Sequence, residues 1–263
     1  MRVEVYADAQ AAGRAAARKI AGELADKPDS VLGLATGHTM IPVYGELVRL
    51  HEEAGLSFAR AATVNLDEYV GLSKGDPDSF YEFMNVRLIS QVDLPRDRFF
   101  IPNGKAVDLV AECARYEEQI QELGGIDLQL LGLGRNGHIG FNEPGSPRES
   151  RTRVVELSEE TRRVNAGDFR VLEYTPARAI TMGVATILEA GKLLLVVTGW
   201  EKTEILYQTL TTPPTPDLPA SFLHEHPQVT VVADQEALEL YFLREGKRPD
   251  PFSVTLSFAR TWS

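Results

Sequence analysis

The side chains best suited to acid–base chemistry are one histidine and three carboxylates. His138 stands five positions before Glu143, and a carboxylate so placed can orient an imidazole ring and stabilise its protonated form. Asp67 and Glu68 are adjacent at the end of a short apolar run, so strand alternation would point them in different directions, one as a base and the other as a structural ligand. Spacing alone leaves two plainer readings open: a structural histidine in a glycine-rich turn, and a solvated acidic pair.

A second candidate feature is a loop that could hold a phosphate. This loop follows an apolar segment and precedes a helical one, and its sequence is Gly33-Leu-Ala-Thr-Gly-His-Thr39. Its backbone amides could surround an anion before the helix that follows. The residues expected to contact the anion are Thr36, Gly37, His38 and Thr39. It is not a nucleotide P-loop, because the Gly-Lys-Ser/Thr ending is missing. An ordinary strand-to-helix turn is the alternative, and His38 by itself fits a supporting or surface position better than a catalytic one.

The loop from Gly132 to Gly137 matches the pattern G-x-G-x-x-G, which binds nicotinamide dinucleotides when it follows a strand. That pattern requires a helix to open at the third glycine, whereas Gly140, Pro144 and Gly145 would break one. No acidic residue ends a strand about 20 positions later, as the ribose contact requires. We therefore reject a dinucleotide cofactor and expect an irregular loop that brings three polar side chains into a cleft: Asn136, His138 and Glu143.

Neither a metal site nor a disulfide is predicted. His224 and His226 could face the same side of an extended segment, but no third ligand with suitable spacing is evident. Cys113 is the single cysteine, which excludes a disulfide framework and a multi-cysteine zinc site. Nothing at the start of the sequence resembles a signal peptide, so we expect a cytoplasmic location.

The composition predicts a soluble protein with one large α/β domain over residues 1–263. Its 263 residues are 43% hydrophobic, which is enough to bury a full core. No apolar run approaches the ~20 residues needed to cross a bilayer, and the longest, Lys192–Thr198, is predicted to be a buried strand. The net charge of −11 disfavours nucleic acid and anionic membranes as partners, so a phosphate group must be captured locally.

Short runs rich in Val, Ile and Leu alternate with longer segments of helical period, which predicts a mainly parallel sheet whose strands are joined by crossover helices. The predicted strands are Val3–Tyr6, Val31–Ala35, Thr63–Leu66, Ile126–Leu133, Ala179–Thr181, Leu193–Thr198 and Val229–Val232. The predicted helices are Asp8–Leu24, Ile41–Glu53, Ser79–Ile89, Val107–Leu123, Thr186–Ala190, Glu201–Leu210 and Glu236–Leu240.

Three segments interrupt this alternation. The proline-rich stretch Pro213–Pro219 is predicted to be a surface loop. The polar segment Ser146–Tyr174 is too long for an ordinary connection and is predicted to be a mobile lid. The tail after Gly246, about residues 246–263, ends in Ser253–Ala259, which alternates weakly like an edge strand and has no assigned place in the sheet.

Polar residues follow four of the predicted strands. In open α/β sheets, ligands bind outside the carboxyl ends of the strands, because loops converge there and helix N-termini point into the crevice. Polar groups scattered by chance would also follow helices, so the coincidence favours one shared site. The four segments are Thr36–Thr39, Asp67–Tyr69, Asn136–Glu143 and Trp200–Lys202.

Taken together, these segments resemble the glucosamine-6-phosphate deaminase family, in family order and over about residues 3–240. The two most specific matches are Asn65-Leu-Asp-Glu-Tyr-Val-Gly-Leu72 and Gly132-Leu-Gly-Arg-Asn-Gly-His-Ile-Gly-Phe-Asn-Glu-Pro-Gly145. Shorter matches are Gly33-Leu-Ala-Thr-Gly37, Ser79-Phe-Tyr81, Ala179-Ile-Thr-Met-Gly183 and His226-Pro227. The related 6-phosphogluconolactonases have an arginine after the Asp-Glu pair and lack Phe-Asn-Glu-Pro. The resemblance implies a three-layer α/β/α fold of modified Rossmann type.

The resemblance also implies an amino-sugar phosphate isomerase-deaminase of N-acetylglucosamine catabolism, which converts glucosamine 6-phosphate and water to fructose 6-phosphate and ammonia without a metal or organic cofactor. Asp67 would move a proton between C2 and C1 of the open-chain sugar. His138 would promote ring opening, assisted by Glu143 and Asn136. Lys202 would hold the phosphate with the loop Thr36–Thr39, and the expected substrate-binding residues are Thr36, Gly37, His38, Thr39, Lys202 and Glu68.

Two positions near the site depart from the family pattern. Asn136 stands where some members have aspartate, so Glu143 must supply the negative charge beside His138 alone. Arg153 is followed two positions later by Val155 rather than by a basic residue, which predicts no activation by N-acetylglucosamine 6-phosphate.

The lid departs further. The family stretch Asn-x-Arg-Phe-Phe, whose arginine reaches the phosphate, reads Asn165-Ala-Gly-Asp-Phe169 here. Either Arg162, Arg163 or Arg170 takes over this contact, or the phosphate is held more weakly, or the substrate differs.

Other functions remain open at this point. Because the lid is altered, galactosamine-6-phosphate deaminase remains an alternative activity. A 6-phosphogluconolactonase-like hydrolase is a further enzymatic alternative. A non-catalytic sugar-phosphate sensor would need a DNA-binding or partner segment, whereas the sequence begins directly with a predicted strand. The resemblance leaves open whether the chain forms a homo-oligomer, because family members range from monomers to hexamers.

Overall fold

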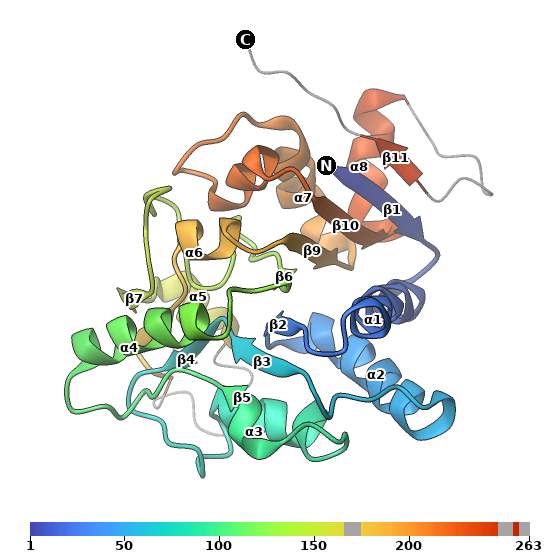
Figure 1. Ribbon diagram of the computed structural model, residues 1–263. Helices are drawn as coiled ribbons and strands as arrows, with labels where there is room; N and C mark the ends of the chain where they lie inside the picture. The colour runs from blue at the N-terminus through green and yellow to red at the C-terminus, as the bar shows by residue number, and fades with distance from the viewer. Residues whose placement is uncertain (166–174, 247–254, 258–263) are drawn as a thin grey trace.

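A mainly parallel sheet forms the centre of the computed structural model, which describes residues 1–165, 175–246 and 255–257 (Figure 1). Its eight strands within these residues lie in the order β11-β1-β10-β9-β6-β2-β3-β5. All neighbours are parallel except β11, which pairs antiparallel with β1 at one edge. The strands are β1 (Arg2–Tyr6), β2 (Val31–Leu34), β3 (Ala62–Asn65), β5 (Phe99–Phe100), β6 (Leu128–Gly132), β9 (Lys192–Val197), β10 (Val229–Asp234) and β11 (Thr255–Ser257).

Helices cover both faces of this sheet, which confirms the predicted three-layer α/β/α architecture. Figure 1 shows α1 and α2 on one side and α4, α6, α7 and α8 on the other. The strands β2, β6 and β9 are almost entirely buried, as expected for parallel strands covered on both faces. The helices are α1 (Ala9–Asp26), α2 (Ile41–Ala54), α3 (Phe80–Met84), α4 (Leu109–Glu122), α5 (Glu159–Asn165), α6 (Val184–Leu188), α7 (Thr203–Thr211) and α8 (Gln235–Glu245).

A second, antiparallel sheet was not predicted. It has the order β4-β8-β7, formed by β4 (Asp67–Tyr69), β7 (Arg153–Glu156) and β8 (Arg178–Thr181). The segment Ala179–Thr181 is a strand as predicted, but it belongs to this sheet and not to the parallel one. Because only Leu66 separates the end of β3 from the start of β4, the chain passes directly from the main sheet to the small one, whose first residue is Asp67.

The segments predicted to be a lid and an unplaced tail each contain a strand. Within Ser146–Tyr174, residues Arg153–Glu156 pair with β8, so this part of the segment belongs to the small sheet. Residues 166–174, including Arg170, lie outside the described residues. In the tail, β11 adopts the predicted edge-strand conformation, and its place is beside β1.

Two further observations bear on the exclusions made from the sequence. No helix opens between Leu133 and Thr152, so the glycine loop after β6 lacks the helix that a dinucleotide site needs, as predicted. Among the described residues, none of the helices combines the length and apolarity that crossing a bilayer requires.

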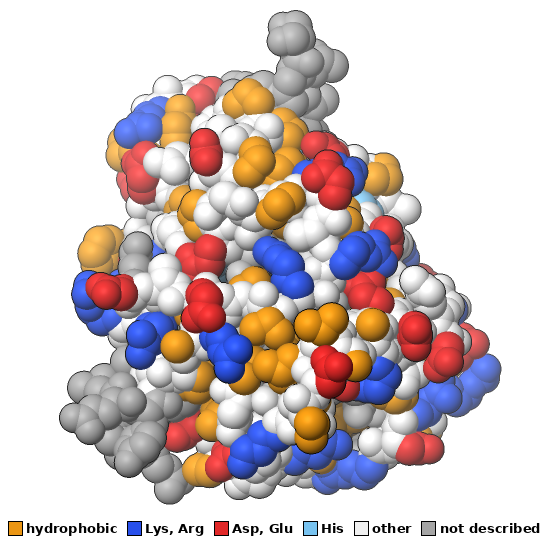
Figure 2. Space-filling model, turned by 90° about the vertical axis from the view of Figure 1, so that its left-hand side faces the viewer, with side chains coloured by type: hydrophobic (Ala, Val, Ile, Leu, Met, Phe, Trp, Pro, Cys, Tyr) orange, Lys and Arg blue, Asp and Glu red, His pale blue; other side chains and the backbone are white. Residues whose placement is uncertain are grey.

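On the face that carries α4 and β7, basic and acidic side chains are interspersed (Figure 2).

Candidate active site

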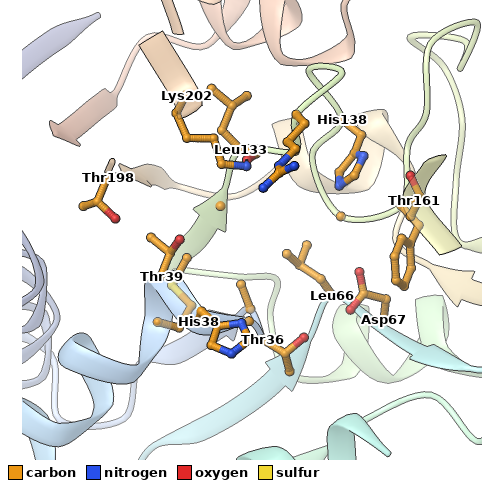
Figure 3. A pocket seen from close by; sticks show the side chains of 18 of the residues that line it. Thr36, His38, Thr39, Leu66, Asp67, Leu133, His138, Thr161, Thr198 and Lys202 are labelled. Carbon is orange, nitrogen blue, oxygen red and sulfur yellow. The ribbon is translucent and has the colours of Figure 1, made fainter. Parts of the chain in front are cut away.

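A cavity of about 650 Å³ opens at the carboxyl ends of β2, β3, β6 and β9 (Figure 3). Residues from all four polar segments singled out in the sequence line it, as a shared site requires. From those segments the lining residues are Thr36, Gly37, His38, Thr39, Asp67, Tyr69, Asn136, His138, Gly140, Phe141, Glu201 and Lys202. Of the ten residues predicted from the sequence, eight line the cavity, and Glu68 and Glu143 do not.

Asp67 presents a buried carboxylate to this cavity. It is the first residue of β4, its side chain faces the cavity in Figure 3, and it is only 5% exposed. Burial raises its pKa from 3.8 to about 8, and the negative charge of Glu68 adds to the increase. A carboxylate with a pKa near neutrality can both accept and return a proton.

Glu68 points the other way, as strand alternation predicts. Its carboxylate accepts hydrogen bonds from the backbone amides of Tyr69, Phe80 and Tyr81, at 2.8, 3.1 and 2.9 Å. Burial raises its pKa to about 7, although these three amides oppose the increase. Glu68 therefore holds the start of α3 against β4, and it does not line the cavity to which the sequence analysis assigned it.

His138 contributes a neutral imidazole. Burial lowers its pKa from 6.5 to about 4, the charge of Glu143 opposes this decrease, and the charge of Lys202 adds to it. The ring packs directly over Gly134, where an added Cβ would lie 2.3 Å from Nε2 of His138, so a larger residue there would displace the ring. The Nδ1 atom of His138 is buried and has no hydrogen-bond partner among the described residues.

Glu143 is held beside His138 by a short chain of hydrogen bonds. The amide nitrogen Nδ2 of Asn136 donates to Oε2 of Glu143 at 2.6 Å, and Oδ1 of Asn136 accepts from the backbone amide of His138 at 3.3 Å. From the other side, Oγ of Ser158 donates to Oε1 of Glu143 at 3.2 Å. Asn136 thus positions a carboxylate and does not supply a charge itself.

Ser158 was missed in the sequence analysis. Its Oγ also accepts from the backbone amide of Thr161 at 3.1 Å, which caps the N-terminus of α5, and Thr161 lines the cavity. A serine followed by Glu159 and Glu160 is an ordinary sign of a helix start, so the helix could have been predicted. The contact with Glu143 could not, since it joins residues 15 positions apart.

The opposite end of the cavity is polar and basic. Thr36, His38 and Thr39 come from the turn between β2 and α2, where Gly37 has a φ of 105° that favours glycine. Lys202 lies across the cavity from them in Figure 3, and its Nζ donates to the carbonyl of Leu133 at 2.7 Å. Burial lowers the pKa of Lys202 to about 8, and the charge of Arg135 adds to the decrease.

The two histidines considered as metal ligands engage the backbone instead. Nε2 of His224 lies 2.8 Å from the carbonyl of Thr209, and Nε2 of His226 lies 2.7 Å from that of Ala190. In the described part of the chain, His, Cys, Asp and Glu form no cluster of three or more that would suit a metal ion.

The fold and this cavity define an α/β protein whose candidate site, lined by a buried carboxyl group and an imidazole, lies where the chain passes from the main sheet to the small one. Residues 6–232 match the family described as glucosamine-6-phosphate isomerases/6-phosphogluconolactonase. The chain belongs to this family, which confirms the resemblance drawn from its motifs.

Several similar proteins lie on the deaminase side of the family. Glucosamine-6-phosphate deaminase 1 of Bacillus subtilis (strain 168) is 51% identical over 225 residues, which cover 86% of this chain and 93% of that protein. Glucosamine-6-phosphate deaminase of Bacillus pumilus (strain SAFR-032) is 48% identical over 237 residues, which cover 90% and 98%.

Solved structures agree with this placement. The structure of a monomeric glucosamine-6-phosphate deaminase has a TM-score of 0.90 and 48% identity, covering 91% of this chain and 100% of that one. The 6-phosphogluconolactonase from Trypanosoma brucei has a TM-score of 0.72 at 24% identity, covering 90% and 97%, and shares the fold alone.

Proposed function

We propose that this chain is a glucosamine-6-phosphate deaminase, which converts glucosamine 6-phosphate and water to fructose 6-phosphate and ammonia. The observation that carries the proposal is that a buried carboxylate, Asp67, and a neutral imidazole, His138, line one cavity whose other end holds Lys202 and the turn Thr36–Thr39. The names of relatives about 50% identical over most of the chain support it.

Ring opening is the first step in this proposal. A neutral imidazole can take the proton of the O1 hydroxyl and deliver one to the ring oxygen, which releases the open-chain aldehyde. The low pKa of His138 keeps its ring neutral at physiological pH, and the nearby charge of Glu143 stabilises the imidazolium while it carries the proton. Asn136 and Ser158 keep Glu143 in place for this purpose.

Isomerisation and loss of ammonia follow. The aldehyde at C1 acidifies the proton on C2, and the ionised carboxylate of Asp67 removes this proton and returns it to C1 through an enolamine. Water then adds to the resulting C2 iminium group, and ammonia leaves as the ketone forms. The sequence moves protons and adds water without a net transfer of electrons to or from the sugar, so it requires no electron carrier.

The phosphate end of the substrate would lie between Lys202 and the turn Thr36–Thr39. An ammonium group and the amides before a helix are both suited to bind a phosphate. Fixing the sugar by its phosphate keeps C1 and C2 within reach of Asp67. The single, buried Cys113 supports the proposed location in the reducing cytoplasm.

Release of ammonia and fructose 6-phosphate from glucosamine 6-phosphate tests the proposal, with galactosamine 6-phosphate and 6-phosphogluconolactone as competing substrates. Asp67→Asn should lose at least about 1,000-fold in turnover, because the amide cannot accept the C2 proton. Full turnover by Asp67→Asn would remove its assigned role, and preference for either competing substrate would overturn the proposed reaction.

A further inference from the structure

Arg135 is a cation at the cavity that neither the sequence analysis nor the proposed steps use. It lies in the loop after β6, three positions before His138, and lines the cavity together with Lys202. Its guanidinium forms an ion pair with the carboxylate of Glu201, which also lines the cavity. Glu201 directly precedes Lys202 in the short turn before α7.

In this ion pair, a bound anion can take the place of the Glu201 carboxylate on Arg135. The side chains of Arg135 and Glu201 are 50% and 47% exposed, and ion pairs as exposed as this one contribute little to stability. Phosphate offers the guanidinium two parallel charge-assisted hydrogen bonds and a larger negative charge than one carboxylate. Exchange of Glu201 for phosphate would therefore cost little and strengthen the contact.

The charges around Lys202 favour the same exchange. Arg135 lowers the pKa of Lys202, so the two cations are close enough to repel each other, while Glu201 partly offsets this repulsion. A phosphate between the two cations would remove the repulsion.

We propose that Arg135 is a second cationic ligand of the substrate's phosphate and that Glu201 is the counterion it leaves when the phosphate binds. The inference rests on the proposed function only in taking that phosphate to belong to a sugar. Glu201 then acts as a competitor at the site, which sets how tightly the anion is held.

Binding of inorganic phosphate, measured by isothermal titration calorimetry at constant ionic strength, tests this inference without any turnover. Arg135→Ala should weaken phosphate binding by about tenfold, the effect of one charge-assisted contact. Glu201→Gln should strengthen it by about two- to fivefold, because the competing charge is gone. Arg244→Ala is the control, since Arg244 pairs with Glu204 away from the cavity at a similar exposure of 48% and 56%.

The opposite signs keep the test decisive, because misfolding cannot strengthen binding. A phosphate affinity of Arg135→Ala within twofold of wild type, or no binding by the wild type, overturns the assignment of Arg135. A Glu201→Gln variant that binds no more tightly than wild type overturns that of Glu201. If the binding pattern holds but the wild type releases no ammonia from glucosamine 6-phosphate, the proposed function fails and the anion site stands.

Discussion

Replacing Asp67 by asparagine should remove the proposed base and at the same time stabilise the fold at alkaline pH. The folded protein raises the pKa of this carboxyl from 3.8 to about 8, a difference of about 4 pH units. At 1.36 kcal/mol per unit, ionisation of buried Asp67 opposes folding by up to about 6 kcal/mol. Structural relaxation and water entry reduce such penalties, so we expect a gain of about 3 kcal/mol for Asp67→Asn.

The pH dependence follows from the direction of the shift. Asp67 binds its proton more tightly in the folded than in the unfolded chain, so its contribution favours folding at low pH and is lost as the pH rises toward about 8. Asparagine does not titrate. The two proteins should therefore be about equally stable near pH 4, should diverge through the window from about 4 to 8, and should keep a constant difference above it.

Urea unfolding at a series of pH values measures this difference directly. Asp29→Asn is the matched control, because Asp29 is exposed between α1 and β2 and its replacement should leave the stability difference small at every pH. A gap between Asp67→Asn and wild type that does not change with pH would refute the reasoning, since it would mean that Asp67 ionises in the fold as it does in water. Gain of stability with loss of turnover is the signature of a strained catalytic group.

Three further predictions concern catalysis. The value of kcat/KM should peak near pH 8, rising as Asp67 ionises and falling as Lys202 loses the proton that binds phosphate; steady-state rates between about pH 6 and 10 measure this. Gly134→Ala should lower kcat/KM at least about 100-fold, because the new Cβ would lie 2.3 Å from the ring of His138; rates and circular dichroism together measure this. Ser158→Ala should lower kcat about tenfold, because it removes the hydrogen bond to the Glu143 carboxylate beside His138. It should also lower the free energy of unfolding by about 1 kcal/mol, because it removes the N-terminal cap of α5.

Each of these has a control variant or an outcome that would contradict it. A rate that stays flat over the whole pH range would contradict the assignment of Asp67 and Lys202. Gly45→Ala adds a Cβ on α2 with no atom within 4 Å, so it should keep full activity, and equal losses at both glycines would point to a general effect on folding. Asp108→Ala removes the N-terminal cap of α4, so it should lose similar stability to Ser158→Ala with an unchanged kcat.

Much of the fold could be predicted from local patterns. Runs of Val, Ile and Leu separated by segments of helical period require a parallel sheet with helices on both faces, and parallel strands bring their carboxyl ends to one edge. This geometry explains why Thr36–Thr39, Asp67, His138 and Lys202 could be predicted to share a site, although 28 to 166 positions separate them in the chain. Alternation along β4 likewise predicted that Asp67 and Glu68 would face opposite ways.

Alternation alone could not predict which of those two acids faces the cavity, because that choice depends on how β4 pairs with β8, more than 100 residues later. The same pairing places β7 inside the segment expected to be a lid, since edge strands of a small sheet have little pattern of their own.

By itself, then, the sequence determined the sheet, the family and the residues that meet at one edge, because hydrophobic period and specific motifs are properties of the chain. Only the tertiary structure decided the acid–base character of the site. The pKa values of Asp67, His138 and Lys202 are set by burial and by charges from distant segments, and the contacts of Ser158 with Glu143 and Arg135 with Glu201 join separate loops. Desolvation and charge pairing depend on distances in space, which residue spacing does not specify.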